Sequence, residues 1–172
     1  MNTWHTSIRI ALLLLVAVAC QRQEGTYIYE AVNADGWHYD SAAVITIDTL
    51  YTTTTYTADL HVRLTQHYPY DELLLAVEQT WQLPTDTIAT TPLHTDRRTL
   101  RRDTLHLHVA KASNELSGAG MSRRHFQAAL PPIYLHAGQS GTLRITPAMR
   151  VHRLRGISDV GIRLQPIEQH PK

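Results

Sequence analysis

The sequence predicts an all-β protein: a two-sheet antiparallel β-sandwich, Ig-like or jelly-roll-like, with about eight strands. Tyrosine outnumbers phenylalanine eight to one, and Thr and Val are plentiful, which favours strands over helices. Short runs alternate between apolar and polar residues, as half-buried strands do. Turn residues separate these runs between residues 26 and 166, and no stretch has the pattern of a long amphipathic helix.

A secretory signal that ends in a cysteine precedes this region. The apolar core from Ile10 to Ala19 is too short to span a bilayer, which takes about 20 residues, but suits a signal peptide, whose core has roughly 7–15. The small residues Ala17 to Ala19 stand directly before Cys20, as in a bacterial lipoprotein. A signal cleaved at another bond and an uncleaved anchor are the alternatives, since Arg9 is the only Lys or Arg before Cys20.

We therefore expect four segments: a signal peptide (1–19), the lipidated cysteine with a short spacer (20–25), a β-sandwich domain (26–166) and a C-terminal tail (167–172). Acyl chains on Cys20 would bind membrane lipid. At about 0.8 kcal/mol per buried methylene, two or three chains hold a domain firmly at a membrane. Cys20 is the only cysteine, so its acylation leaves no thiol for a disulfide.

Charge gives no support to nucleic-acid or acidic-lipid binding. The chain has 16 Lys and Arg, one of which is Arg9 of the signal, against 15 Asp and Glu. The mature protein is therefore neutral apart from its histidines.

Four strands are expected in the first half of the domain: Thr26–Val32, Val44–Asp48, Tyr56–Leu64 and Leu73–Trp81. In the third run every second residue is apolar, which places Tyr56, Ala58, Leu60, Val62 and Leu64 on one face. Pro69 interrupts the chain between the last two runs, and we expect those two strands to pair as neighbours.

Four further strands are expected at Thr99–Ala110, Tyr134–His136, Thr142–Thr146 and Val160–Leu164. Thr99–Ala110 offers Leu100, Leu105, Leu107 and Val109 to the core, provided that a bulge near residues 101–103 changes the register. Residues 113–120 should form an irregular crossing, and residues 147–154 a single helical turn or a continuation of the strand before them.

The sequence indicates no catalytic, cofactor-binding or metal-binding residues. His106 and His108 share one strand face, but two ligands do not complete a zinc site, and both should face solvent. The turn at residues 138–141 lacks the spacing of a nucleophilic serine motif. The adjacent carboxylates Asp71 and Glu72 should point to opposite faces. We therefore expect no enzyme.

Basic and aromatic residues allow two interpretations. Arg97, Arg98, Arg101 and Arg102, with Arg123 and Arg124, could form a patch for lipid headgroups or an acidic partner. A solvated edge strand kept soluble by its charges is the favoured interpretation. Trp37 and Trp81 are expected in the core rather than on a ligand-binding surface.

Several segments in this order resemble the gliding-motility lipoprotein GldH family of Bacteroidetes: the cysteine at position 20, then residues 36–41, 67–73, 116–120, 147–150 and 156–163. The block Gly156-Ile157-Ser158-Asp159-Val160-Gly161-Ile162-Arg163 is the most specific. The family commonly has a tryptophan near Leu116 and a glutamine where Pro147 stands, so the chain departs from the pattern there.

The resemblance implies a β-rich lipoprotein of the cell envelope, needed for surface motility in gliding members and associated with the type IX secretion and gliding apparatus. It implies no enzyme, and of the family's features only the lipidated cysteine carries over, onto Cys20.

We thus expect an accessory lipoprotein, facing the periplasm, that docks other envelope proteins. The alternative is a lipoprotein that binds carbohydrate or a small ligand through exposed Trp37 or Trp81. Exposed, coplanar tryptophans would favour ligand binding, and buried ones would favour docking.

The lipid anchor can be tested directly. Mass spectrometry of the lipoprotein purified from its native membrane should show a chain that begins at Cys20 and carries acyl groups on this residue. A Cys20→Ala form should lack them. An unmodified chain that starts at another residue would exclude the anchor.

Overall fold

The computed structural model describes residues 25–33, 35–82, 98–109 and 123–167, and its strand-only architecture confirms the all-β prediction. Across these residues, no helix is long and apolar enough to cross a membrane. Within the described ranges, eight strands have five residues or more, and two short strands have two residues each. In order they are β1 (Thr26–Ala31), β2 (Trp37–His38), β3 (Ala43–Ile47), β4 (Thr54–Thr65), β5 (Glu72–Gln82), β6 (Arg98–His108), β7 (Arg123–Leu135), β8 (Ser140–Pro147), β9 (Arg153–Leu154) and β10 (Ile157–Pro166).

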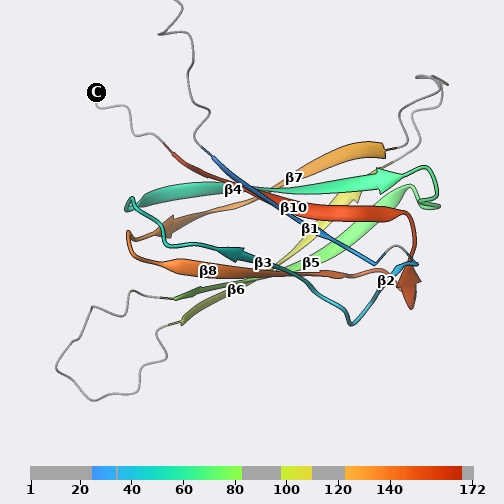
Figure 1. Ribbon diagram of the computed structural model, residues 1–172, viewed down its shortest axis with the longest axis horizontal. Helices are drawn as coiled ribbons and strands as arrows, with labels where there is room; N and C mark the ends of the chain where they lie inside the picture. The colour runs from blue at the N-terminus through green and yellow to red at the C-terminus, as the bar shows by residue number, and fades with distance from the viewer. Residues whose placement is uncertain (1–24, 34, 83–97, 110–122, 168–172) are drawn as a thin grey trace, which may run out of the picture.

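The strands form two four-stranded layers that face each other (Figure 1), in the orders β1-β10-β4-β7 and β3-β8-β5-β6. The short strands β2 and β9 pair at one end. Four antiparallel pairs are nested along the chain: β5 with β6, β4 with β7, β3 with β8 and β1 with β10. This nesting is the strand order of a jelly roll, one of the two sandwich types that the sequence predicts.

The core lies between the inner faces of the two large sheets. Alternate residues of each strand point inward, as the period of two requires. Burial of each large aliphatic side chain contributes about 1.5–3 kcal/mol relative to exposure. The fully buried members include Leu60, Val62, Leu64, Leu73, Leu75, Val77, Leu143, Ile145, Val160 and Ile162.

The predicted pairing of β4 with β5 is wrong. β4 pairs with β10 and β7, whereas β5 pairs with β6 and β8 in the other sheet. Both strands have one apolar face, and this pattern suits strands that face each other across a core as well as strands that pair side by side. The link at residues 66–71 carries the chain from one sheet to the other at the end of the sandwich.

The bulge predicted near residues 101–103 is absent, because β6 pairs with β5 in unbroken register over its whole length. Leu100 therefore shares the outer face with His106 and His108 and is 52% exposed, which corrects its placement in the core. The other predicted core residues of this run, Leu105, Leu107 and Val109, are buried.

The strand predicted at residues 134–136 is the end of the much longer β7. Its register against β4 shifts between Tyr56 and Ala58, and Pro131 and Pro132 occupy the extra length of β7 at this bulge. An edge strand accepts prolines because its outward N–H groups need no partner. Residues 147–154 contain no helical turn: β8 ends at Pro147, and after a bend the chain forms β9.

The polar side of β4 points away from the core as predicted, but one of its residues is covered. His61 is only 5% exposed, because the rings of Tyr27 and Tyr29 of β1 lie 5.9 and 6.2 Å from its ring. His125 stacks on its other side, with His61 Nδ1 2.9 Å from His125 Nε2. Burial, with the neighbouring His125, lowers the pKa of His61, so this imidazole is neutral at pH 7.

Two glycines make room for aromatic rings on neighbouring strands. Gly141 of β8 is the direct partner of Trp81 of β5, and a Cβ on this glycine would lie 2.4 Å from two carbons of the buried ring. Gly161 of β10 faces Tyr29 of β1 in the same way, again with 2.4 Å to the nearest ring carbon. Each ring thus covers a position where the neighbouring strand has no side chain.

We expect Gly141→Ala to lower the free energy of unfolding by about 2 kcal/mol, because the new methyl group would displace the buried Trp81 ring. Urea unfolding of the wild type and the variant measures the difference. Thr142→Ala, on the outer face of the same strand, should cost less than about 1 kcal/mol. Equal losses for the two variants would contradict the steric explanation.

Candidate functional site

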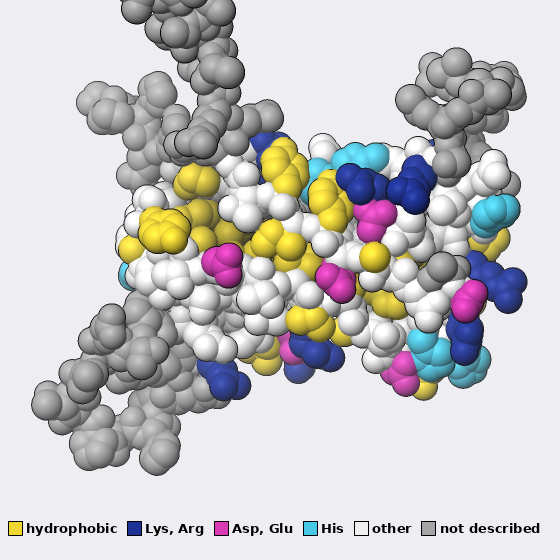
Figure 2. Space-filling view, in the orientation of Figure 1, with side chains coloured by type: hydrophobic (Ala, Val, Ile, Leu, Met, Phe, Trp, Pro, Cys, Tyr) yellow, Lys and Arg dark blue, Asp and Glu magenta, His cyan; other side chains and the backbone are white. Residues whose placement is uncertain are grey.

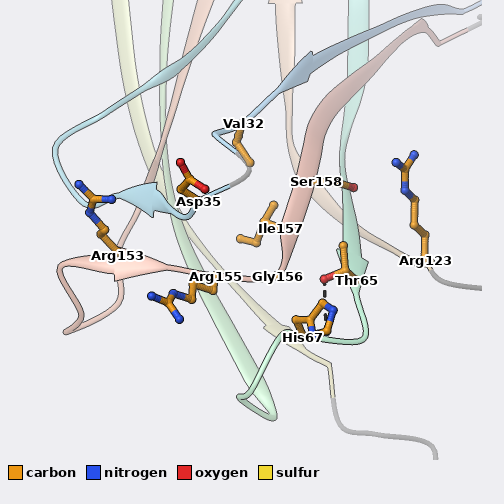
Figure 3. A pocket seen from close by; sticks show the side chains of 10 residues that line it. All are labelled: Val32, Asp35, Thr65, His67, Arg123, Arg153, Arg155, Gly156, Ile157 and Ser158. Carbon is orange, nitrogen blue, oxygen red and sulfur yellow. Dashed lines mark hydrogen bonds between the residues drawn. The ribbon is translucent and has the colours of Figure 1, made fainter.

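A pocket of about 1000 Å³ lies at one end of the sandwich (Figure 3). At this end β1 and β4 finish, and β7 and β10 begin. The pocket is lined by Val32, Asp35, Thr65, His67, Arg123, Arg153, Arg155, Gly156, Ile157 and Ser158.

Backbone hydrogen bonds hold the link from β9 to β10 and the start of β10 beside other lining residues of the pocket. Thr65 N–H donates to the Gly156 carbonyl at 2.8 Å, and Val32 N–H donates to the Ser158 carbonyl at 3.2 Å. Gly156 has a φ of 84°, and a Cβ there would lie 2.3 Å from the backbone nitrogen of Tyr68. Only glycine allows this close approach of the β9–β10 segment to the β4–β5 link.

Tyr68 anchors the β4–β5 link beside the pocket. Its ring is buried, and its hydroxyl donates to the Glu72 carbonyl at 2.7 Å. Burial, with the nearby Tyr70, raises the pKa of Tyr68 far above its usual value, so the hydroxyl stays protonated and remains a donor. The role of Tyr68 is therefore structural.

Positive charge dominates the lining of the pocket. Arg153 and Arg155 stand on one side and Arg123 across from them (Figure 3), whereas Asp35 is the only carboxylate among the lining residues. Guanidinium groups match the oxygen pairs of carboxylates and phosphates, which favours an anionic ligand or an acidic protein segment.

The hydroxyl groups of the pocket belong to its framework. Ser158 Oγ lies 2.6 Å from Asp159 Oδ2 and 3.2 Å from the Arg63 carbonyl. Arg63 in turn donates to Asp159 Oδ1 at 2.9 Å. Thr65 Oγ1 accepts a hydrogen bond from the His67 backbone at 3.3 Å. These contacts tie the hydroxyl groups to the backbone and to Asp159.

Both tryptophans considered for ligand binding are buried. Trp37 is 2% and Trp81 1% exposed, as the sequence predicts for core residues. Trp37 Nε1 donates to the Ser41 carbonyl at 2.8 Å, and Trp81 Nε1 donates to Gln79 Oε1 at 3.4 Å. Neither ring can stack on a ligand, so the carbohydrate-binding alternative loses the residues on which it depends.

His106 and His108 of β6 face solvent as predicted, and an acidic side chain lies beside them. Glu72 of β5 reaches both, with Oε2 3.1 Å from His106 Nε2 and Oε1 3.6 Å from His108 Nδ1. The sequence could have indicated this third group only if the register between β5 and β6 had been known.

Those of the predicted patch arginines that the structure describes do not gather into one patch. Arg101 donates to the carbonyls of Pro131 and Pro132 of β7, and Arg102 forms an ion pair with Glu78 at 2.8 Å. Arg124 donates to the Val109 carbonyl, whereas Arg123 lines the pocket. These contacts agree with the interpretation of β6 as a charged edge strand. Arg101 also links β6 to β7, the edge strand of the other large sheet.

The other predicted positions lie in the turn before β8 or outside the described residues. Ser140 begins β8 after the expected turn, in which Gly138 has a φ of 86°. Cys20, Arg97 and residues 113–120 lie outside the described residues. The sequence analysis did not identify Arg153 and Arg155 as candidate binding residues. They flank the buried Leu154, and this alternation of polar and apolar residues is the pattern of a short strand.

Comparison with known proteins agrees with the resemblance seen in the sequence. The profile of the family described as GldH lipoprotein matches residues 26–164, which is most of the chain and includes both large sheets. A search of curated proteins found no match.

Among solved structures, Eiger TNF from S. frugiperda is 10% identical, with 86% of this chain and 97% of that chain covered and a TM-score of 0.28. The VP2 subviral particle of infectious bursal disease virus is 11% identical, with 87% and 42% covered and a TM-score of 0.19. Similarity at this level carries no argument about fold or function.

We expect Tyr68→Phe to lower the free energy of unfolding by about 1 kcal/mol, because the Glu72 carbonyl loses the hydroxyl donor that the buried Tyr68 supplies. Tyr70→Phe is the matched control, since Tyr70 is exposed and should change stability by less than about 0.5 kcal/mol. Urea unfolding measures both. A Tyr68→Phe protein as stable as the control would show that this hydrogen bond does not support the pocket.

Proposed function

The chain belongs to the GldH lipoprotein family, and we propose that it is a membrane-anchored envelope lipoprotein without enzymatic activity that docks other envelope proteins. Its docking surface is the basic pocket, and the partner presents an acidic segment to it. The observation that carries the proposal is the position of three arginines at the end of the sandwich opposite to the start of β1.

The path of β1 supports this arrangement. Thr26 pairs with Leu164 at one end of the sheet, and Ala31 pairs with Asp159 beside the pocket. Five steps of about 3.3 Å separate the two ends of β1 by roughly 17 Å. Cys20 precedes Thr26 by six positions in the sequence. A lipid on Cys20 would attach the chain near the start of β1, and we expect the pocket at the other end of this strand to face away from the membrane, towards the periplasm.

Confinement at a membrane strengthens a modest interface. A tethered domain meets partners in the same membrane at a high effective concentration, so a few charged contacts suffice. The exposed arginines can steer an acidic segment into the pocket. The gliding and type IX secretion components that the family resemblance implies are the partners we expect.

Two observations support docking over the other functions. The hydroxyls of Thr65 and Ser158 are engaged in the framework of the pocket rather than poised for catalysis. Trp37 and Trp81 are buried, which removes the aromatic surface that a sugar-binding protein would use.

The proposal predicts that docking depends on both the anchor and the pocket charge. After cross-linking in intact cells, the wild-type lipoprotein should recover a specific envelope protein. An Arg153→Glu/Arg155→Glu variant should recover at least about tenfold less of it, because an acidic segment would meet repulsion. The Cys20→Ala form should also recover less, because it is not confined to the membrane. Quantitative mass spectrometry of the recovered proteins measures the ratio.

The matched control is Arg98→Glu/Arg144→Glu, which changes the charge equally at exposed arginines outside the pocket. It should recover the partner within about twofold of the wild type. Thermal unfolding should show that both double variants remain folded. Equal losses for the two variants, or no envelope protein recovered with the wild type, would refute docking through the pocket.

A further inference from the structure

Three side chains of metal-ligand type gather on the outer face of the second sheet. Glu72 of β5 is the direct partner of His108 of β6, and His106 stands opposite Leu74. Residues two positions apart on a strand share a face, so the two imidazoles lie side by side with the carboxylate across from them. Val109 N–H donates to the Asp71 carbonyl at 2.7 Å, which continues the pairing beyond the three residues. The hydrogen-bonded pairing of β5 and β6 therefore fixes the relative backbone positions of the three residues.

The distances between their donor atoms suit a shared ion. Glu72 oxygens lie 3.1 Å from His106 Nε2 and 3.6 Å from His108 Nδ1, and donor atoms of all three residues lie within 4.8 Å of one another. Two ligands bound at about 2.0–2.1 Å in tetrahedral geometry are roughly 3.4 Å apart. Small rotations of the exposed side chains would bring the more distant donor atoms to this spacing.

The donor set selects the kind of ion. Imidazole nitrogens suit Zn²⁺, Cu²⁺ and Ni²⁺, whereas Mg²⁺ and Ca²⁺ prefer sites made of oxygen alone. Two histidines and one carboxylate are also the protein ligands of one group of open zinc sites, in which water or another donor takes the remaining position. We propose that Glu72, His106 and His108 form an open surface site for a divalent transition-metal ion, with Zn²⁺ as the ion it fits best.

This site is separate from the docking pocket and does not depend on it. None of its three residues lines the pocket. Without a metal, the same contacts would be exposed polar contacts between a carboxylate and two imidazoles, and such contacts contribute little to stability. The two explanations differ in whether the three residues bind added zinc together.

The test is the binding of Zn²⁺ alone to the full-length lipoprotein in detergent, measured by isothermal titration calorimetry at pH 7.5. The wild type should bind one Zn²⁺ that requires all three residues. Each of His106→Ala, His108→Ala and Glu72→Gln should weaken this binding at least about 100-fold, since even groups that only orient a ligand change affinity 10–100-fold. Saturating Zn²⁺ should raise the Tm of the wild type but not of these variants.

His136→Ala is the matched control, because His136 is also exposed but lies beyond the far end of β7. It should bind Zn²⁺ like the wild type. Cys20 is present in every protein compared, so any contribution from its sulfur cancels in the ratios. Urea unfolding without metal should show that each variant is folded, and Glu72→Gln keeps nearly the shape of the native side chain. Wild-type binding no tighter than that of the three variants, or an equal loss in His136→Ala, would overturn the proposal.

Discussion

The packing of two inner sheet faces against each other is the constraint on which this structure depends. Each large sheet has one apolar face, and neither can leave that face in water. The consecutive strands β4 and β5 lie in different sheets and contribute their apolar rows to the same core. The chain must therefore cross the end of the sandwich between them. Two residues make this crossing possible. Tyr68 buries its ring within the crossing segment, and Gly156 has no side chain, so its backbone can pass close to that segment.

The crossing between the sheets also explains where charged and polar side chains cluster. Connections between layers lie at the ends of a sandwich, where side chains can be charged without disturbing the core. The β4–β5 link leads directly to Glu72. Arg153 stands in β9, and Arg155 stands in the link from β9 to β10. In the view of Figure 2, histidine, arginine and acidic side chains gather at the right-hand end of the molecule, whereas hydrophobic side chains show over the opposite half. Rigid strands thus present two groups of charged residues at the end away from the start of β1.

The first strand, β1, follows the expected lipid attachment site and is held by more than edge pairing. β1 forms six residue pairs with β10, and its tyrosines lie over the outer face of the sheet. Arg63 stacks on Tyr29 at 4.2 Å, and Arg163 stacks on Tyr27 at 5.1 Å. The absence of a side chain at Gly161 lets Tyr29 lie flat on its partner strand. These contacts join the segment nearest the expected lipid to the rest of the domain.

The sequence by itself determined which way side chains point, because alternation along a strand is a local property. It predicted the inward row from Tyr56 to Leu64, the buried tryptophans and the outward pair His106 and His108. Every residue except proline offers the same backbone donor and acceptor, so the sequence did not say which strands pair. Only the tertiary structure placed Arg63 beside Asp159, 96 positions away, and Glu72 beside the two histidines. It also turned Leu100 outward, because the register of a whole ladder outweighs the preference of one side chain.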